Sequence, residues 1–296
     1  MFDYLDKLIT LAQIHGEVNI QCEFQGSWQI QPQIDKHKGL FHLIEQGECW
    51  LTLGDKSFHL KAGDIFFLPQ HLFHTMASQS KIPSLSQVDF SQKGIFELHK
   101  IGQGTPNLKM FCGTFYYQKP SLLIDALPAY LHLSLNDSPL QPLLQLFLNE
   151  AQQVQIGSKS VIDALANVLF IQILRHALQL GLLNQGLLAS LQDKRLYPVL
   201  WQMLNAPQED WNMQKLAALA TMSRANFIRV FHQKIGIPPG KFLSQIRLQQ
   251  AALLLKTTQK NILQIALEVG YQSEAHFSKA FKRYFGILAS EFRKQE

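Results

Sequence analysis

Residues 211–292 contain the same small sequence unit twice, and this repeat limits what the last third of the chain can fold into. Four positions recur at one fixed spacing: Ser223 and Ser273, Phe227 and Phe277, Phe231 and Phe281, and Gly236 and Gly286. The separation of Leu216 and Ile265 is one residue shorter, so the second copy has a turn that is one residue longer. A repeat that occurs only twice is typical of a tandem pair of similar units rather than of a solenoid.

Each copy predicts a helix, a tight turn and a second helix. Ser223 and Ser273 suit N-cap positions, because a serine oxygen accepts hydrogen bonds from the free N–H groups of a first helical turn. Apolar residues follow at helical spacing, and Gly236 and Gly286 end the helices. The opposite face carries Arg224, Ala225, Ile228, Arg229 and His232 in the first copy, and Glu274, Ala275, Ser278, Lys279 and Lys282 in the second. This is the geometry of helix-turn-helix DNA binding, in which the second helix lies in the major groove.

The repeat resembles the AraC/XylS family of transcription regulators from Ala217 to Arg293. The residues that carry the resemblance include Met222-Ser223-Arg224, Phe227, Arg229, Gly236, Pro239, Arg247-Leu248, Val269-Gly270-Tyr271, Phe285-Gly286 and Phe292-Arg293. The chain departs from the family at Leu288-Ala289, where the family usually has Ser-Pro. The resemblance implies that promoter DNA is a partner and that Arg247 has a structural role. The implied DNA-contacting residues are Ser223, Arg224, Ala225, Ile228, Arg229, Ser273, Glu274, Ala275, Ser278, Lys279 and Lys282.

The charge of the chain is uneven, in a way that suits DNA binding by its C-terminal part. Residues 190–296 carry 15 Lys and Arg against 7 Asp and Glu, whereas the net charge of the 296-residue chain is +5. A basic module behind a mildly acidic one matches what phosphate-backbone binding requires of the C-terminal part alone. The length is enough for two domains with ordinary cores.

Three cysteines without a CxxC pair argue against a disulfide scaffold and for a reducing compartment. The first residues are acidic where a secretory signal would be basic, so we expect a cytoplasmic protein. The longest apolar run, residues 161–180, contains Asp163, Asn167, Gln172 and Arg175, which predicts an amphipathic helix and no membrane span.

Short apolar runs between glycines predict a β-barrel or sandwich from Val18 to Tyr117. The spacing of Gly63, Pro69 and His74 resembles the second cupin motif. The first cupin motif is incomplete, because Leu40 stands where an acidic metal ligand is usual. We therefore expect an α+β protein with a cupin-like sensor barrel at residues 1–120, a helical linker or dimerisation segment at 121–190, and a tandem helix-turn-helix DNA-binding domain at 191–296. Within the linker, residues 140–155 and 160–180 are expected to be helices.

Four residues form the expected sensor site: Cys22, His42, His74 and Cys112. The runs around them resemble an AraC-type subfamily of activators that respond to reactive chlorine, and this resemblance implies redox sensing by Cys22 and Cys112. Two thiolates and two imidazoles also make a tetrahedral zinc set, which oxidation of the thiolates would disrupt. The bland alternative is that each residue is an ordinary core side chain, since a lone buried Cys behaves as a small hydrophobe.

Three functions remain open at this point. The first is a transcription regulator, not an enzyme, whose barrel senses an oxidant, a metal or a small ligand. The second is a metal-dependent cupin enzyme fused to a helical tail, although the chain contains no phosphate loop, nucleophile elbow or HExxH motif. The third is a DNA-binding protein whose barrel only dimerises. A homodimer through residues 160–180 or a barrel edge is expected, and RNA polymerase is a further partner if the protein is an activator.

Overall fold

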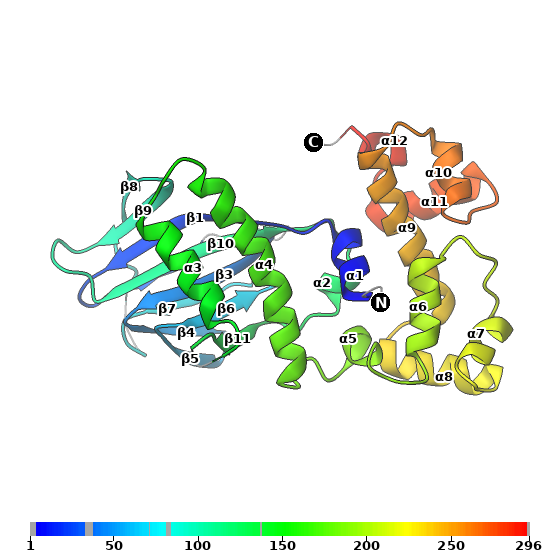
Figure 1. Ribbon diagram of the computed structural model, residues 1–296, viewed down its shortest axis with the longest axis horizontal. Coiled ribbons are helices and arrows are strands. Elements are labelled where there is room, and N and C mark those ends of the chain that lie inside the picture. The colour runs from blue at the N-terminus through cyan, green and yellow to red at the C-terminus, as the bar shows by residue number, and fades with distance from the viewer. Residues whose placement is uncertain (1–3, 33–37, 71, 81–83, 137, 295–296) are drawn as a thin grey trace. The chain divides into compact units, whose positions relative to one another are not determined.

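A computed structural model describes residues 4–32, 38–70, 72–80, 84–136 and 138–294. The chain divides into two compact units, which are coloured along the chain in Figure 1. The barrel unit comprises residues 14–117 and 128–182, and the helical unit comprises residues 1–13, 118–127 and 183–296. These units are not the three consecutive segments expected from the sequence, because residues 4–13 and 118–127 group with the C-terminal helices.

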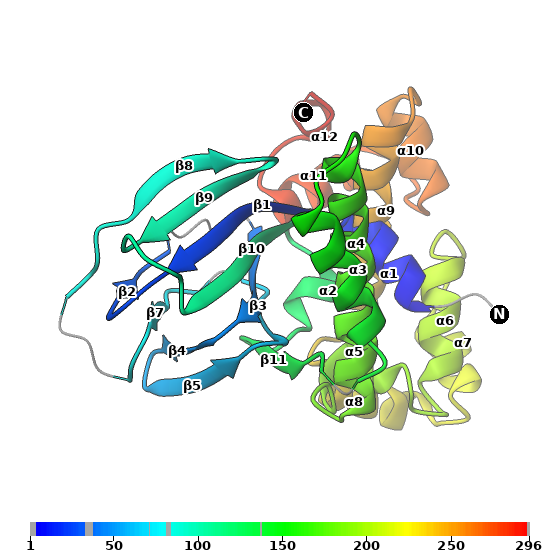
Figure 2. The same cartoon turned by 60° about the vertical axis from the view of Figure 1, so that its left-hand side comes forward.

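The described residues of the barrel unit form two β-sheets. The larger sheet has the strand order β11-β6-β3-β10-β1-β9-β8 and the smaller has the order β2-β7-β4-β5. The larger sheet consists of β1 (His15–Phe24), β3 (Lys38–Gln46), β6 (Asp64–Leu68), β8 (Asp89–Lys93), β9 (Phe96–Ile101), β10 (Leu108–Tyr116) and β11 (Leu131–Ser134). The smaller consists of β2 (Gln29–Ile30), β4 (Glu48–Leu53), β5 (Lys56–Lys61) and β7 (Thr75–Ala77). Figure 2 shows the two sheets facing each other.

Alternation along the strands of the larger sheet gives it two buried faces. Side chains at every second position, such as Cys22, Ile44 and Met110, point between the sheets and join one core cluster with residues of β4, β5 and β7. The intervening positions, such as Phe67 and Phe115, make edge-to-face contacts with Phe170 on the outer face. Helices α3 (Gln141–Gln152) and α4 (Ser158–Gln179) cover that outer face. This explains why β3 is buried along almost its whole length.

The expectation of a wholly helical segment after residue 121 is wrong at β11. Residues Leu131–Ser134 form an edge strand paired antiparallel with β6. The alternation of Leu131, His132, Leu133 and Ser134 is the period-2 signal of a strand, but nearby prolines favoured an interpretation as a broken helix. The two helices expected at residues 140–155 and 160–180 are confirmed as α3 and α4. Helix α4 is long and apolar enough to span a membrane by length and composition, and its apolar face packs on the sheet.

The helical unit contains the expected pair of helix-turn-helix motifs. The first motif is α7 (Met213–Leu219) and α8 (Arg224–Ile235), and the second is α10 (Ile262–Glu268) and α11 (Glu274–Phe285). Helix α9 (Pro239–Thr257) joins the two motifs. In the sequence, α5 (Gly186–Ser190) and α6 (Tyr197–Asn205) precede the first motif, and α12 (Ala289–Phe292) follows the second. The short helices α1 (Tyr4–Ala12) and α2 (Leu122–Asp125) complete the unit, and α1 packs on α2, α6 and α9.

The predicted helix ends of the repeat are confirmed. Ser223 and Ser273 are N-caps whose side chains accept hydrogen bonds from the backbone N–H groups of Asn226 and His276. Gly236 and Gly286 end α8 and α11 with left-handed backbone angles, φ +87° and +82°. The turn of the second motif, residues 269–273, is one residue longer than residues 220–223, as the spacing predicts. Equivalent caps and turns therefore hold α8 and α11 in equivalent places within their motifs.

Candidate functional site

The four residues of the expected sensor site meet inside the barrel. Cys22 lies on β1, Cys112 on the neighbouring β10 and His42 on β3 at the other side of β10. His74 lies just before β7 and reaches the same place from the smaller sheet. The Sγ atoms of Cys22 and Cys112 are 4.0 Å apart, and Cys112 Sγ is 3.1 Å from Nδ1 of His42. Nε2 of His42 is 2.9 Å from Nε2 of His74.

These contacts form a chain of hydrogen bonds whose protons can be assigned from one end. The backbone oxygen of Leu72 only accepts, so Nδ1 of His74, 2.9 Å away, carries a proton. A neutral His74 then accepts at Nε2, and His42 donates to it from its own Nε2. His42 is left with Nδ1 facing Cys112, so a proton is shared between this nitrogen and the sulfur. This nitrogen can therefore exchange a proton with the sulfur of Cys112.

The electrostatics distinguish the two thiols. The hydrogen bond from Cys22 and the positive charge of His42 hold the pKa of Cys112 well below its usual range, although burial acts in the opposite direction. The same hydrogen bond, together with burial, raises the pKa of Cys22. Burial raises the pKa of Cys49 to about 12. Cys112 is therefore the thiol suited to act as a nucleophile, Cys22 is suited to follow it, and Cys49 is suited to neither role.

Access to this site is restricted. Cys22 is 1% exposed and Cys112 is 7% exposed, and the apolar side chains of the core between the two sheets surround them. Only a small reagent suits such an enclosure. All three cysteines are free thiols.

The donors do not converge on one point. His42 faces Cys112 with one ring nitrogen and His74 with the other, so the two contacts lie on opposite sides of its ring. The described residues contain no group of three or more His, Cys, Asp or Glu arranged to hold a metal ion. A zinc ion shared by all four residues would require rotation of His42 and a change in the hydrogen-bond chain. With His42 oriented in this way, the arrangement fits proton and thiol chemistry.

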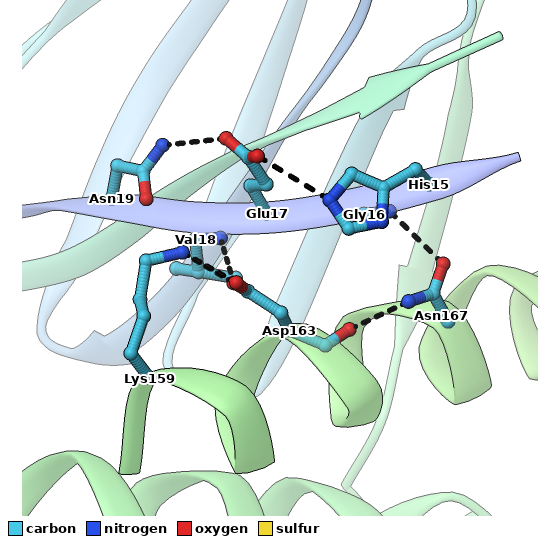
Figure 3. A network of polar contacts seen from close by, with 8 residues as sticks. All are labelled: His15, Gly16, Glu17, Val18, Asn19, Lys159, Asp163 and Asn167. Atoms are coloured by element: carbon cyan, nitrogen blue, oxygen red, sulfur yellow. Dashed lines mark hydrogen bonds and ion pairs between the residues drawn. The ribbon is translucent and has the colours of Figure 1, made fainter. Parts of the chain in front are cut away.

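A second polar cluster, which the sequence analysis did not single out, holds the first half of β1 against α4 (Figure 3). Asn167 Oδ1 accepts from the backbone N–H of Gly16 at 3.0 Å, and Asp163 Oδ1 accepts from that of Val18 at 3.4 Å. Lys159 Nζ pairs with the Asp163 carboxylate at 2.5 Å. Asp163 and Asn167 are four residues apart in an apolar helical run, and this spacing on the buried face was the signal in the sequence.

The residues expected to contact DNA all lie at the surface of the helical unit. Most of them are exposed, and Ile228, Ser273 and Ser278 are partly exposed. On α8 the guanidinium of Arg229 donates to Asn226 Oδ1 at 2.9 Å. Arg247 on α9 instead donates to the backbone oxygens of Pro207 and Glu209, at 2.7 and 2.9 Å. These contacts show Arg247 bridging backbone segments within its own unit.

Comparison with known proteins agrees with both halves of this description. A cupin family profile matches residues 3–179, and a helix-turn-helix domain profile matches residues 216–295. Over 99% of its length the chain is 60% identical to an uncharacterized HTH-type transcriptional regulator of Haemophilus influenzae, 98% of which is covered. The chain belongs to the AraC family of transcription regulators.

Other members of the family resemble the chain over its whole length. It is 36% identical to the HTH-type transcriptional regulator MtrA of Neisseria gonorrhoeae, with 99% of this chain and 98% of the relative covered. It is 27% identical, with the same coverage, to RclR of Escherichia coli, an RCS-specific HTH-type transcriptional activator. The chain is thus a DNA-binding transcription regulator, and its named relatives are regulators rather than enzymes.

Proposed function

We propose that this regulator senses a small two-electron oxidant through Cys22 and Cys112. The observation that carries the proposal is the 4.0 Å approach of the two sulfurs, with His42 Nδ1 3.1 Å from one of them. The similarity to an RCS-specific activator supports hypochlorous acid as the oxidant. The cytoplasm, where the thiols stay reduced until an oxidant appears, is the compartment that suits such a sensor.

The chemistry follows from the roles of the two thiols. The thiolate of Cys112 attacks the chlorine of hypochlorous acid, which forms an S–Cl bond and releases hydroxide. The sulfur of Cys22 then attacks Sγ of Cys112, chloride leaves, and the thiol proton of Cys22 neutralises the hydroxide. Two thiols and one hypochlorous acid thus give a disulfide, chloride, a proton and water. The thiols lose two electrons and the chlorine gains them.

Mass spectrometry combined with promoter binding tests this function. The reduced protein is treated with one equivalent of hypochlorous acid, and the disulfide state and the promoter affinity are measured on the same sample. We expect a Cys22–Cys112 disulfide and a changed affinity in the wild type and in the control Cys49→Ala, and neither change in Cys22→Ser or Cys112→Ser. An affinity change that persists in both serine variants would leave a small organic ligand as the surviving signal.

Zinc binding by Cys22, His42, His74 and Cys112 remains a separate prediction, which metal analysis tests. It requires about one equivalent of zinc in the anaerobically purified protein and loss of that zinc in Cys112→Ser. Oxidation of Cys22 and Cys112 requires no zinc, because the hydrogen-bond chain already orients His42 toward Cys112.

The exposed faces of α8 and α11 are proposed to contact DNA. Arg224 and Arg229 can pair with guanine edges or with phosphate from α8. Lys279 and Lys282 are the exposed cations on the matching face of α11. Successive major-groove segments on one side of a duplex are about 34 Å apart, and α8 and α11 would each enter one of two such neighbouring segments. If the protein is an activator, RNA polymerase is its further partner at the promoter.

A homodimer formed through α4 is proposed from a stripe on its outer face. The stripe consists of Val161, Ala164, Val168, Ile171, Arg175 and Leu178. These positions alternate in steps of three and four, which is the spacing of a coiled-coil seam. Val161 and Val168 are 40% and 42% exposed, although the same helix covers a sheet with its other face. A second copy of α4 carries the same stripe, so two α4 helices can pack these side chains against each other.

A further inference from the structure

The two strands that carry the sensor cysteines are also the strands that connect the barrel unit to the helical unit. The chain enters β1 from residues 1–13, and it leaves β10 toward residues 118–127. The strands pair antiparallel up to His15 and Tyr116. Beyond them, the N–H of Gln118 donates to the backbone oxygen of Ala12 at 2.8 Å. A backbone hydrogen bond therefore also joins the two segments to each other within the helical unit.

The first of those segments packs on the helix that joins the DNA-binding motifs, and the second packs on the first. Helix α1 buries Leu5, Leu8 and Leu11 and packs on α2, α6 and α9. Tyr4 also contacts Tyr197 of α6 edge to face, with ring centroids 6.0 Å apart. A displacement of α1, on which α2 packs, would thus act on α9, which connects the two helix-turn-helix motifs.

Closing the disulfide would require the strands to move. Cys22 pairs with Met110 and Cys112 pairs with Ile20, so the two cysteines are diagonal rather than directly opposite. Diagonal neighbours have Cα atoms about 7–8 Å apart, at or beyond the upper end of the range that a disulfide spans. The sulfurs must also approach from 4.0 Å to about 2 Å. Formation of the disulfide therefore shortens the distance between Cys22 and Cys112, which requires β1 and β10 to slide past each other or to move closer together.

The polar cluster of Lys159, Asp163 and Asn167, the α4 cluster, determines which part of β1 this displacement moves. Asn167 and Asp163 hold the N–H groups of Gly16 and Val18, which lie just before an irregularity of the β1–β10 pairing between Val18 and Ile20. A Cβ atom on Gly16 would lie 2.9 Å from Cβ of Ala166, so β1 and α4 are already in close contact there. While the hydrogen bonds hold, this end of β1 moves together with α4. Without these hydrogen bonds, the strand can bend at the irregularity next to Val18, and the displacement would end there.

We propose that β1, β10 and the side chains of Asp163 and Asn167 form the element that transmits oxidation of the cysteines to the DNA-binding motifs. The inference rests on the proposed redox function, because the disulfide supplies the movement. Asp163 and Asn167 keep the start of β1 rigid, so the movement passes into residues 4–13 and 118–127. It then reaches α9 through α1 and α2.

The test compares the wild type with the double variant Asp163→Ala/Asn167→Ala and with Gln172→Ala, an amide-to-methyl control on the same helix. Disulfide formation is followed by mass spectrometry, promoter affinity is measured before and after oxidation, and hydrogen exchange is measured in residues 4–12 and 118–125. We expect all three proteins to bind the promoter equally in the reduced state and to form the disulfide. Oxidation should change the affinity of the wild type and the control by roughly fivefold or more, and that of the double variant by less than about twofold. Exchange in residues 4–12 should change only in the first two proteins.

A second variant and a second oxidant separate failure of the proposed oxidant signal from failure of the proposed transmission. Insertion of Gly-Gly between Gln13 and Ile14 leaves the α4 cluster in place and adds slack, so it should also abolish the response. Diamide, which takes two electrons and two protons from a pair of thiols, forms the disulfide independently of hypochlorous acid. If hypochlorous acid forms no disulfide but diamide does, the proposed signal is wrong, and the diamide samples still test transmission. A full response in both the double variant and the insertion variant would overturn this inference, as would failure of diamide to link the cysteines.

Discussion

Nδ1 of His42 lies 3.1 Å from the sulfur of Cys112, while Nε2 of the same ring lies 2.9 Å from His74. His42 therefore links a thiol to a second imidazole, and the backbone oxygen of Leu72 orients that imidazole from the far side. A buried thiol normally resists ionisation, because burial penalises the charged form. At Cys112 the neighbouring donors oppose this penalty, and at Cys49 nothing comparable does.

The first prediction concerns the pH dependence of Cys112. The pKa of Cys112 is lowered, so its thiolate persists as the pH falls from 9 toward neutrality, whereas an ordinary thiol with a pKa near 8.5 becomes mostly protonated. Alkylation of Cys112 by iodoacetamide should therefore stay nearly constant over this range. In His42→Ala the positive charge is lost, so the rate at pH 7 should fall about tenfold and rise again with pH. Peptide mass spectrometry of Cys112 measures the rate.

Rates for Cys49 in the same samples serve as the internal control. Because the pKa of Cys49 is about 12, its alkylation should be slow at every pH tested and indifferent to His42→Ala. A Cys112 rate that is unchanged in His42→Ala would show that His42 does not stabilise the thiolate.

The second prediction concerns Arg229. Its exposed guanidinium is held by Asn226 on the outer face of α8, where it can reach a base edge or a phosphate. Arg229→Ala should weaken promoter binding by about 1–3 kcal/mol. Lys100→Ala on β9, which removes an equal charge from the barrel, should leave the affinity unchanged. A footprint and affinity identical to the wild type in Arg229→Ala would exclude Arg229 from the interface.

The third prediction concerns the α4 stripe. Val168→Glu places a charge at the centre of the proposed helix pair, and burying an unpaired charge there is costly. Sedimentation equilibrium of the full chain should show a dimer for the wild type. The dimer dissociation constant of Val168→Glu should be higher by about tenfold or more. Gln179→Glu, at the exposed end of the same helix, is the matched control. A wild type that stays monomeric at micromolar concentration would rule out the dimer.

Local signals in the sequence predicted the parts of the structure that depend on local contacts. Ser223 and Gly236 cap their helix through neighbouring backbone groups, so their spacing alone was sufficient. Cys22, His42 and Cys112 meet because β1, β10 and β3 are adjacent, and strand alternation predicted only that their side chains would point inward. The order in which the donors contact each other depends on ring rotations, which no sequence pattern encodes.

The division of the chain into units is not a local property either. Helix α1 is an ordinary amphipathic segment next to the barrel in sequence, and its buried face fits α6 and α9 more than a hundred residues later. The same holds for Gly270, whose φ is +90° and whose Cβ position would lie 2.8 Å from Cα of Gln208. A glycine is required there by a distant backbone segment, so its reason appears only in the folded unit.

The fourth prediction concerns Arg247, which lies beside Gly270 at this junction. Its guanidinium donates to the oxygens of Pro207 and Glu209, and so ties α9 to the segment between α6 and α7. Arg247→Met keeps the side chain's apolar length but removes two charge-assisted hydrogen bonds, at a cost of about 3 kcal/mol. The melting temperature should fall by several degrees, whereas the exposed Arg195→Met should change it little. Promoter binding, measured well below the transition, should retain its sequence preference. Loss of sequence preference at one base pair without a change in melting temperature would instead show that Arg247 contacts DNA and does not stabilise the helical unit.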